Sequence, residues 1–131
     1  MIVRNMVEIE GTHREVKAEN NNWSSKRILL KKDNMGFSLH ETIIYAGSET
    51  LIWYKNHLEA VYCIEGEGEI ETTVDGIIYP IKPGTMYALD QHDKHYLRAF
   101  DEDLRLICVF NPPLEGDEVH DEDGSYDIKL E

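Results

Sequence analysis

Hydrophobic and polar residues alternate along most of this chain in short runs, a pattern typical of β-strands rather than of helices. Successive side chains of a strand point to opposite faces, so every second residue shares a face. We predict strands over residues 23–30, 37–45, 50–54, 60–64, 77–81, 94–100 and 104–110. Four glycines between residues 66 and 84 supply the backbone conformations that tight antiparallel turns need. So many short strands predict an all-β fold, a small barrel or sandwich with few and short helices.

The length of 131 residues fits one domain with one modest core, so we expect residues 1–131 to form a single domain. Residues 1–18 alternate only loosely, which leaves an edge strand and an irregular lead-in both open. Pro112 and Pro113 end the last predicted strand, because consecutive prolines cannot extend a hydrogen-bonded ladder. The acidic tail, about residues 115–131, has only Tyr126, Ile128 and Leu130 as core-forming residues, and we expect a lid or a mobile end.

The charge and the cysteines narrow the classes of function. A formal net charge of −13 argues against nucleic acid and against anionic membranes as partners. No apolar run approaches the length of a membrane span, and the first residues lack the regions of a signal peptide, so we predict a cytoplasmic protein. Cys63 and Cys108 lie in apolar strands, where buried free thiols are favoured over a disulfide or a ligand role.

Two stretches in the middle of the chain resemble the signature motifs of the cupin superfamily. The first motif ends in Glu, six residues and Gly, which Glu59 and Gly66 match. The second runs from Gly over five residues to Pro-x-Gly and then, after two residues, to His. Gly76, the run 82–84 and Tyr87 occupy these places. The resemblance implies a small antiparallel cupin barrel.

Two departures from the cupin motifs concern the metal site. The expected His-x-His pair falls on Trp53, Tyr54 and Lys55, and the last expected histidine is Tyr87. The usual set of three histidines and one glutamate is therefore absent, and any metal must be held differently.

Glu59, Tyr87 and His95 are the candidate ligands for such a metal. In a cupin barrel the first two point into the cup, and His95 follows Tyr87 by eight residues across one turn, on the neighbouring strand. A carboxylate, a phenolate and an imidazole suit iron(II), manganese or zinc and leave coordination positions open. On spacing alone, Glu59 can equally be a strand-edge acid, Tyr87 a core aromatic and His95 a surface residue.

Longer blocks of the chain resemble the ectoine synthase family within the cupins. These blocks are residues 31–38, 56–70, 79–98, 108–114 and 118–124. The resemblance implies a homodimeric hydro-lyase that closes N-γ-acetyl-L-2,4-diaminobutyrate into ectoine, an osmoprotectant, with loss of water. It also implies iron(II) held by Glu59, Tyr87 and His95.

The same resemblance implies a set of substrate contacts. These are Trp23, Arg27, Thr42, Tyr54, Phe110, Glu118 and His120, together with His40, where some relatives have Asn. Among them, Arg27 suits a two-pronged contact with the substrate carboxylate, although a surface ion pair is the alternative. Trp23 and Phe110 suit walls that curl the substrate and exclude water.

The proton acceptor is open between Tyr54 and the pair of Glu118 and His120. His57 precedes Glu59 by two residues and shares its face, so it either supports the metal ligand from behind or bonds a backbone carbonyl. Two other classes of function also stay open. A cupin binding module, such as the sensing half of a regulator, lacks an accompanying helix-turn-helix pattern here, and an iron oxygenase usually holds its metal with more histidines than this chain provides.

Overall fold

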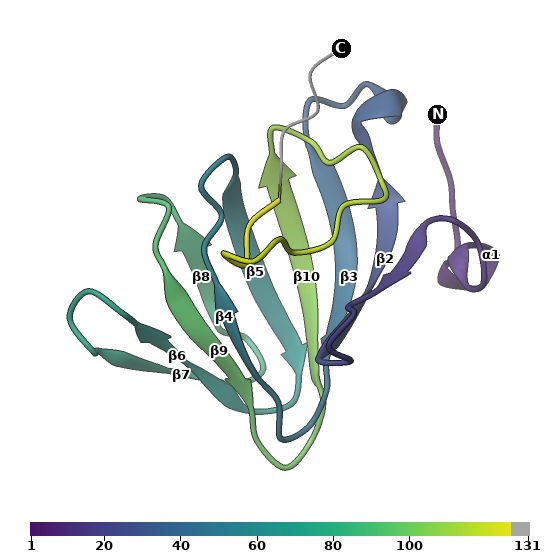
Figure 1. Ribbon diagram of the computed structural model, residues 1–131. Coiled ribbons are helices and arrows are strands. Elements are labelled where there is room, and N and C mark those ends of the chain that lie inside the picture. Colours follow the sequence, from purple (N-terminus) through teal and green to yellow (C-terminus); the bar gives the residue numbers. More distant parts are fainter. Residues whose placement is uncertain (127–131) are drawn as a thin grey trace.

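Two antiparallel β-sheets make up the computed structural model, which describes residues 1–126 (Figure 1). The six-stranded sheet has the order β1 (Glu15–Lys17), β2 (Trp23–Leu29), β3 (Ser38–Ile44), β10 (Leu104–Asn111), β5 (Leu58–Glu65) and β8 (Met86–Leu89). The four-stranded sheet has the order β4 (Glu49–Ile52), β9 (His95–Ala99), β6 (Gly68–Thr72) and β7 (Ile78–Ile81). The sheets converge at one end and diverge at the other, which gives the molecule a cup (Figure 1). The predicted all-β fold is confirmed.

The described helices are short. Helix α1 covers Met6–Ile9, and a single 3₁₀ turn covers Lys31–Asp33. Asn5 caps α1 by accepting a hydrogen bond from the Val7 N–H, and the Glu8 side chain closes the capping box. Residues 1–18 therefore combine a helix with the edge strand β1, one of the two arrangements left open by the sequence.

Each strand predicted from the sequence is present, with ends that agree or differ by at most two residues. The short strands β6 and β8 were not predicted individually, because neither has a long apolar run. In β6 only Gly68 and Ile70 are buried, while Glu69 and Glu71 on the other face accept hydrogen bonds from Arg98 at 2.8 and 3.0 Å. Charges on the outer face of a strand weaken the hydrophobic pattern without weakening the strand.

Alternation along β2 and β3 agrees with the predicted faces. Trp23, Ser25 and Arg27 of β2 are buried, and the residues between them are partly exposed. In β3, Glu41 is an exception, because it is buried although it lies opposite the inward face. Arg105 donates a hydrogen bond to its carboxylate at 2.9 Å, which compensates the buried charge.

The core lies between the two sheets and is mainly aliphatic. Its buried members include Ile44, Ile52, Val61, Ile70, Ile81, Leu89, Leu97, Leu104 and Leu106. Cys63 and Cys108 are also buried and free, as the sequence predicted. Within residues 1–126, no helix is long and apolar enough to cross a membrane.

An ion-pair cluster around Asp33 fixes the N-terminal segment to the six-stranded sheet. Arg4 and Arg14 donate to its carboxylate at 2.9 and 3.2 Å, and the Leu30 N–H donates at 2.9 Å. Burial raises the pKa of Asp33, but the hydrogen bonds from Arg4, Leu30 and Arg14 outweigh it and lower the pKa to about 2.

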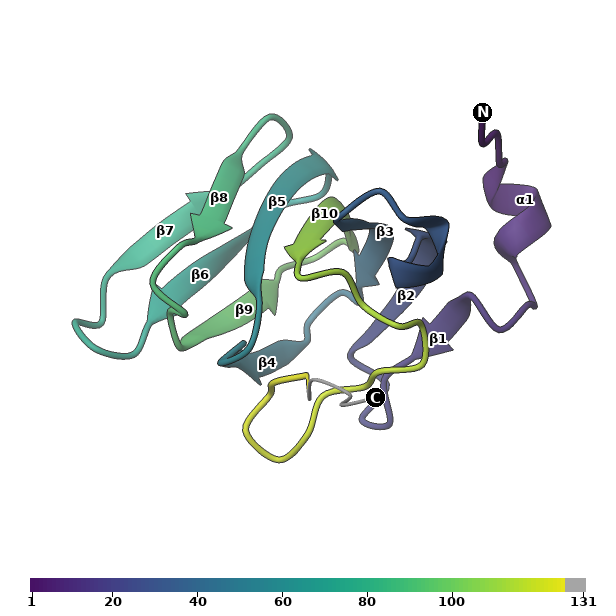
Figure 2. The same cartoon turned by 90° about the horizontal axis from the view of Figure 1, so that it is seen from above.

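The tail after β10 crosses the open end of the cup. Its first part, residues 114–118, is held near β2 and β3 by buried hydrogen bonds: the Leu114 N–H donates to Ser38 Oγ at 3.0 Å, and the Arg27 guanidinium donates to the carbonyls of Gly116 and Glu118 at 2.9 and 2.6 Å. Viewed from above, the tail runs from β10 past β2 and β1 towards β4 (Figure 2).

The last described part of the tail docks beside β4. The Trp53 N–H donates to the Gly124 carbonyl at 2.9 Å, and Asn56 Nδ2 donates to the Tyr126 carbonyl at 3.0 Å. Gly124 has a φ of +72°, and a Cβ there would overlap the Leu51 carbonyl oxygen, so only glycine fits this approach. Whether this tail acts as a lid stays a prediction, and Ile128 and Leu130 lie outside the described residues.

Candidate active site

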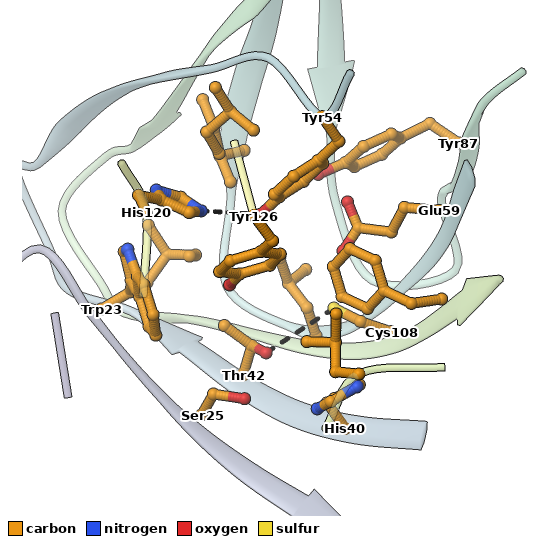
Figure 3. A pocket seen from close by; sticks show the side chains of 16 residues that line it. Trp23, Ser25, His40, Thr42, Tyr54, Glu59, Tyr87, Cys108, His120 and Tyr126 are labelled. Atoms are coloured by element: carbon orange, nitrogen blue, oxygen red, sulfur yellow. Dashed lines mark hydrogen bonds between the residues drawn. The ribbon is translucent and has the colours of Figure 1, made fainter. Parts of the chain in front are cut away.

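A cavity of about 30 Å³ lies inside the cup, and side chains from both sheets and from the tail line it (Figure 3). The lining residues are Trp23, Ser25, His40, Thr42, Ile44, Ile52, Tyr54, Glu59, Tyr87, Leu97, Leu106, Cys108, Phe110, Leu114, His120 and Tyr126. The cavity is thus mainly apolar and aromatic, with a few inward polar groups, which is typical of a small-molecule site.

Glu59 is the acidic group of the cavity. It comes from β5, and only 8% of the residue is exposed. Burial raises its pKa to about 8, and a hydrogen bond with the Cys108 thiol opposes that shift. Among residues 1–126 it forms no ion pair with a lysine, an arginine or a histidine. Without a cation nearby, a buried carboxyl group tends to keep its proton, and a bound cation would stabilise its ionised form.

Tyr87 and His95 lie on the same side of the cup as Glu59. Tyr87 of β8 pairs with Val61 of β5, and its ring centroid is 6.3 Å from that of His95 on β9. Burial raises the pKa of Tyr87 well above its usual range, and the Glu59 charge adds to this effect. His95 is not among the residues that line the cavity, but its side chain is fully buried.

His95 Nδ1 donates to the Asp93 carbonyl at 2.8 Å, which leaves Nε2 with a lone pair. Nε2 is buried and has no hydrogen-bond partner. Burial lowers the pKa of His95, so the imidazole is neutral at neutral pH, as a metal ligand must be. Within residues 1–126, no group of three His, Cys, Asp or Glu side chains is positioned to hold a metal ion. A mixed set of a buried carboxyl group, an adjacent phenol and an unpartnered imidazole nitrogen has the donor chemistry that fits a divalent cation.

Tyr54 and His120 form a hydrogen-bonded pair in the cavity, 2.8 Å apart between the hydroxyl and Nε2 (Figure 3). Burial raises the pKa of Tyr54 well above its usual range, while burial and the Arg27 charge lower the pKa of His120 to about 4. Both groups are therefore neutral near pH 7, and the phenol donates to the imidazole. The Tyr54 carbonyl in turn accepts from His92 Nδ1 at 2.8 Å, so the loop that carries His92 holds the backbone of this tyrosine.

The other substrate candidates fall into two groups. Trp23, His40, Thr42 and Phe110 line the cavity. The His40 ring is 5.3 Å from that of Phe110, its Nε2 bonds Ser38 Oγ at 2.8 Å, and its Nδ1 is buried without a partner. Burial and the Arg27 charge lower the pKa of His40 well below its usual range, so this imidazole is also neutral.

Arg27, Glu118 and His57 do not line the cavity. The Arg27 guanidinium is fully buried against the tail, and the Glu118 carboxylate accepts from the N–H groups of Glu115 and Gly116, both at 2.7 Å. The Arg27 guanidinium and the Glu118 carboxylate are 3.8 Å apart, and this ion pair joins strand β2 to the tail. His57 is buried, with its ring 6.0 Å from Phe110, its Nδ1 has no partner, and burial lowers its pKa.

Three polar lining residues were missed by the sequence reasoning: Ser25, Cys108 and Tyr126. Ser25 shares a strand face with Trp23, and Cys108 shares one with Phe110, so strand periodicity could have found both. Tyr126 lies in the tail, where no strand pattern indicates which way a side chain points.

Together, the two-sheet cup and its inward polar residues define a cupin barrel. A cupin 2 conserved barrel domain protein from Salinispora arenicola has the same fold, with a TM-score of 0.65 and 18% identity, covering 84% of this chain and 87% of that one. This similarity establishes the fold alone.

The family is defined by closer similarities. The family model for ectoine synthase matches residues 1–130. The L-ectoine synthases of Desulfatibacillum aliphaticivorans and Halalkalibacterium halodurans are 65% and 60% identical over 128 residues, covering 98% of this chain and 98% and 97% of theirs. The crystal structure of ectoine synthase from P. lautus superposes with a TM-score of 0.83 at 61% identity, covering 88% of this chain and 81% of that one. The chain belongs to the ectoine synthase family of enzymes.

Proposed function

We propose that this chain converts N-γ-acetyl-L-2,4-diaminobutyrate into ectoine with loss of water, in the cavity of the cup. The match to the family model over residues 1–130 is the observation that carries this proposal. The small, largely apolar cavity between the sheets and the tail supports it, because a dehydration benefits from a site that limits access of bulk water.

The reaction joins the α-nitrogen of the substrate to the carbonyl carbon of its own acetamide group. The ammonium must lose a proton before its nitrogen can attack, and the carbonyl oxygen leaves as water after taking up protons. The protein must therefore move protons between nitrogen and oxygen and hold a flexible chain in a curled conformation.

Tyr54 and His120 are the groups that we assign to proton transfer. The phenol donates to Nε2 of a neutral imidazole over 2.8 Å, so the pair can accept a proton on one side while it releases one on the other. Trp23 and Phe110, with Tyr54, form aromatic walls around the cavity. These walls limit the conformations of the bound chain and keep water away from the reacting atoms.

Glu59, Tyr87 and His95 would hold a divalent cation, for which we propose iron(II), with zinc or manganese as alternatives. Such a cation supplies Lewis acidity towards a substrate oxygen. The buried Nε2 of His95 and the buried Glu59 carboxylate support this assignment. His57, behind Phe110, is proposed to support the site by packing.

The metal proposal is tested by elemental analysis of a matched pair of variants on β5. Glu59→Gln removes the inward carboxylate, and we expect the bound metal to fall by about tenfold or more. Glu65→Gln removes a carboxylate that is 65% exposed at the end of the same strand, and its metal content should equal that of the wild type. Equal metal in both variants would contradict the assignment.

The activity is tested by incubating the purified, metal-analysed protein with the acetylated diamine and following ectoine by NMR. Tyr54→Phe and His120→Ala should each lower the turnover, and unchanged turnover in both would remove this pair from proton transfer. Tight ligand binding without turnover would instead support a binding module, and oxygen uptake would support an oxygenase.

We also propose a homodimer, as the family resemblance implies, and a cytoplasmic location. Apolar side chains that are about half exposed gather on the strands at one side, including Tyr62, Ile78, Tyr79 and Met86, and β8 is an edge strand of its sheet. Sedimentation equilibrium measures the assembly: Met86→Glu should yield monomers if this side forms the interface.

A further inference from the structure

The side chain of Tyr126 fills the part of the cup beneath the tail. Its ring stacks on Tyr54 with a centroid distance of 5.0 Å and an interplanar angle of 23°. The rings of His120 and Phe110 lie at 5.0 and 5.6 Å, and the Arg27 guanidinium carbon lies 5.8 Å from the ring centroid. The residue is 4% exposed, so this aromatic group is fully part of the site.

With this ring in place, the cavity is too small for the substrate. A cavity of about 30 Å³ holds about two water molecules. The acetylated diamine carries a carboxylate, an ammonium and an acetamide on a four-carbon chain, and it needs several times that volume. Some lining side chain must therefore move before the substrate can bind.

The strands that carry most of the lining residues are hydrogen-bonded into sheets, so their backbones are fixed. Three lining residues belong to the tail. Leu114 is tied to Ser38 through its N–H, and His120 is tied to Tyr54 as part of the proposed proton-transfer pair. The Tyr126 ring can leave by rotation of its own side chain while its carbonyl stays bonded to Asn56. This rotation gives up a side-chain hydrogen bond with Tyr54 but breaks no hydrogen bond of either sheet.

Withdrawal of the ring would also uncover a positive charge. Arg27 is fully buried, and its Nε has no hydrogen-bond partner, although the other guanidinium nitrogens bond the tail carbonyls. The space that Tyr126 now fills is next to this guanidinium. The Glu118 carboxylate, 3.8 Å away, offsets this charge only at a distance longer than a hydrogen bond, so the unpartnered Nε still favours an anionic group in that space.

We propose that the Tyr126 ring and the substrate occupy the same part of the cup, so that binding displaces the ring and brings the substrate carboxylate towards Arg27. The proposal rests on the proposed function, because that function supplies a carboxylate-bearing ligand. Tyr126 thereby determines how tightly the cup binds substrate and product.

The test is calorimetric titration of ectoine, which keeps the carboxylate, into full-length proteins of equal metal content. Tyr126→Ala removes the competing ring, and we expect ectoine to bind at least tenfold more tightly than to the wild type. Tyr126→Phe keeps the ring and should change the affinity by less than twofold. Tyr96→Ala removes a tyrosine ring that packs on Arg98 on the outward face of β9, away from the cavity, and this matched control should leave the affinity unchanged.

Equal or weaker binding by Tyr126→Ala would overturn the proposal. That result is expected if the ring forms a wall that contacts the ligand, or if it only holds the tail in place. If that variant does not fold, fluorotyrosine NMR of the wild type decides: the Tyr126 resonance, assigned with Tyr126→Phe, should move to an exposed environment on addition of ectoine. A resonance that stays unchanged in saturated protein would overturn the proposal. A wild type that neither forms nor binds ectoine would overturn the proposed function itself.

Discussion

Replacement of Arg27 by methionine tests whether this residue anchors the tail or binds the substrate carboxylate. The guanidinium is 0% exposed and donates to two tail carbonyls, and it lies 3.8 Å from the Glu118 carboxylate. Methionine fills a similar volume but leaves a buried carboxylate without its cation. Breaking a buried ion pair in this way costs about 3–5 kcal/mol. For a domain of this size, the midpoint of thermal unfolding should fall by about 10–20 °C.

Urea titration followed by circular dichroism measures the free energy of unfolding of Arg27→Met and of the wild type. Arg98→Met is the control, because Arg98 also bonds several carboxylates but lies at the surface, where such pairs contribute about 1 kcal/mol or less. Amide hydrogen exchange should show lost protection in residues 114–126 of Arg27→Met only. If its stability stays within about 1 kcal/mol of the wild type and only KM rises, then Arg27 serves the substrate carboxylate and does not anchor the tail.

Two further predictions concern the termini. The pKa of Asp33 is lowered to about 2 in the folded protein, against 3.8 unfolded, so its contribution is present above pH 4 and is lost as the pH falls towards 2. Asp33→Asn should therefore cost about 2 kcal/mol at pH 7 and almost nothing at pH 2 in urea titrations, and an equal cost at both pH values would refute the ion-pair account. Gly124→Ala sets a methyl group against the Leu51 carbonyl and should lower turnover by about tenfold or more while the β-sheet circular dichroism is retained. Gly47→Ala, which also has a positive φ but faces open space, should keep its activity, and equal losses in both variants would contradict this explanation.

Much of the barrel could be predicted because its strands bury one face. The runs 23–30, 37–45 and 104–110 each alternate or are continuously apolar, and each contains a strand. The apolar run of strand β8 has only four residues, too few to predict a strand by itself, yet β8 carries Tyr87. That residue was placed by its position in the cupin motif and not by periodicity, since a motif fixes register where hydrophobicity does not.

The candidate site was predicted best where residues lie on strands. Trp23, Thr42, Glu59 and Phe110 all point into the cup, as their alternation indicates. Arg27 also lies on the inward face, but its guanidinium is hydrogen-bonded to tail carbonyls and does not line the cavity. No local sequence pattern reveals the contact between Arg27 and Gly116. Long-range docking of an irregular segment depends on tertiary geometry alone, and for the same reason Tyr126 could not be assigned to the site.

The barrel and the site are completed at different points of the chain. Within the described residues 1–126, every strand of both sheets ends by Asn111, whereas the lining residues Leu114, His120 and Tyr126 follow it. A premature stop codon shortly after residue 111 would leave a product with the ten described strands but without the tail over the cup. The cell would then contain folded protein without its activity, so a screen that measures only the amount of folded protein would not detect the defect.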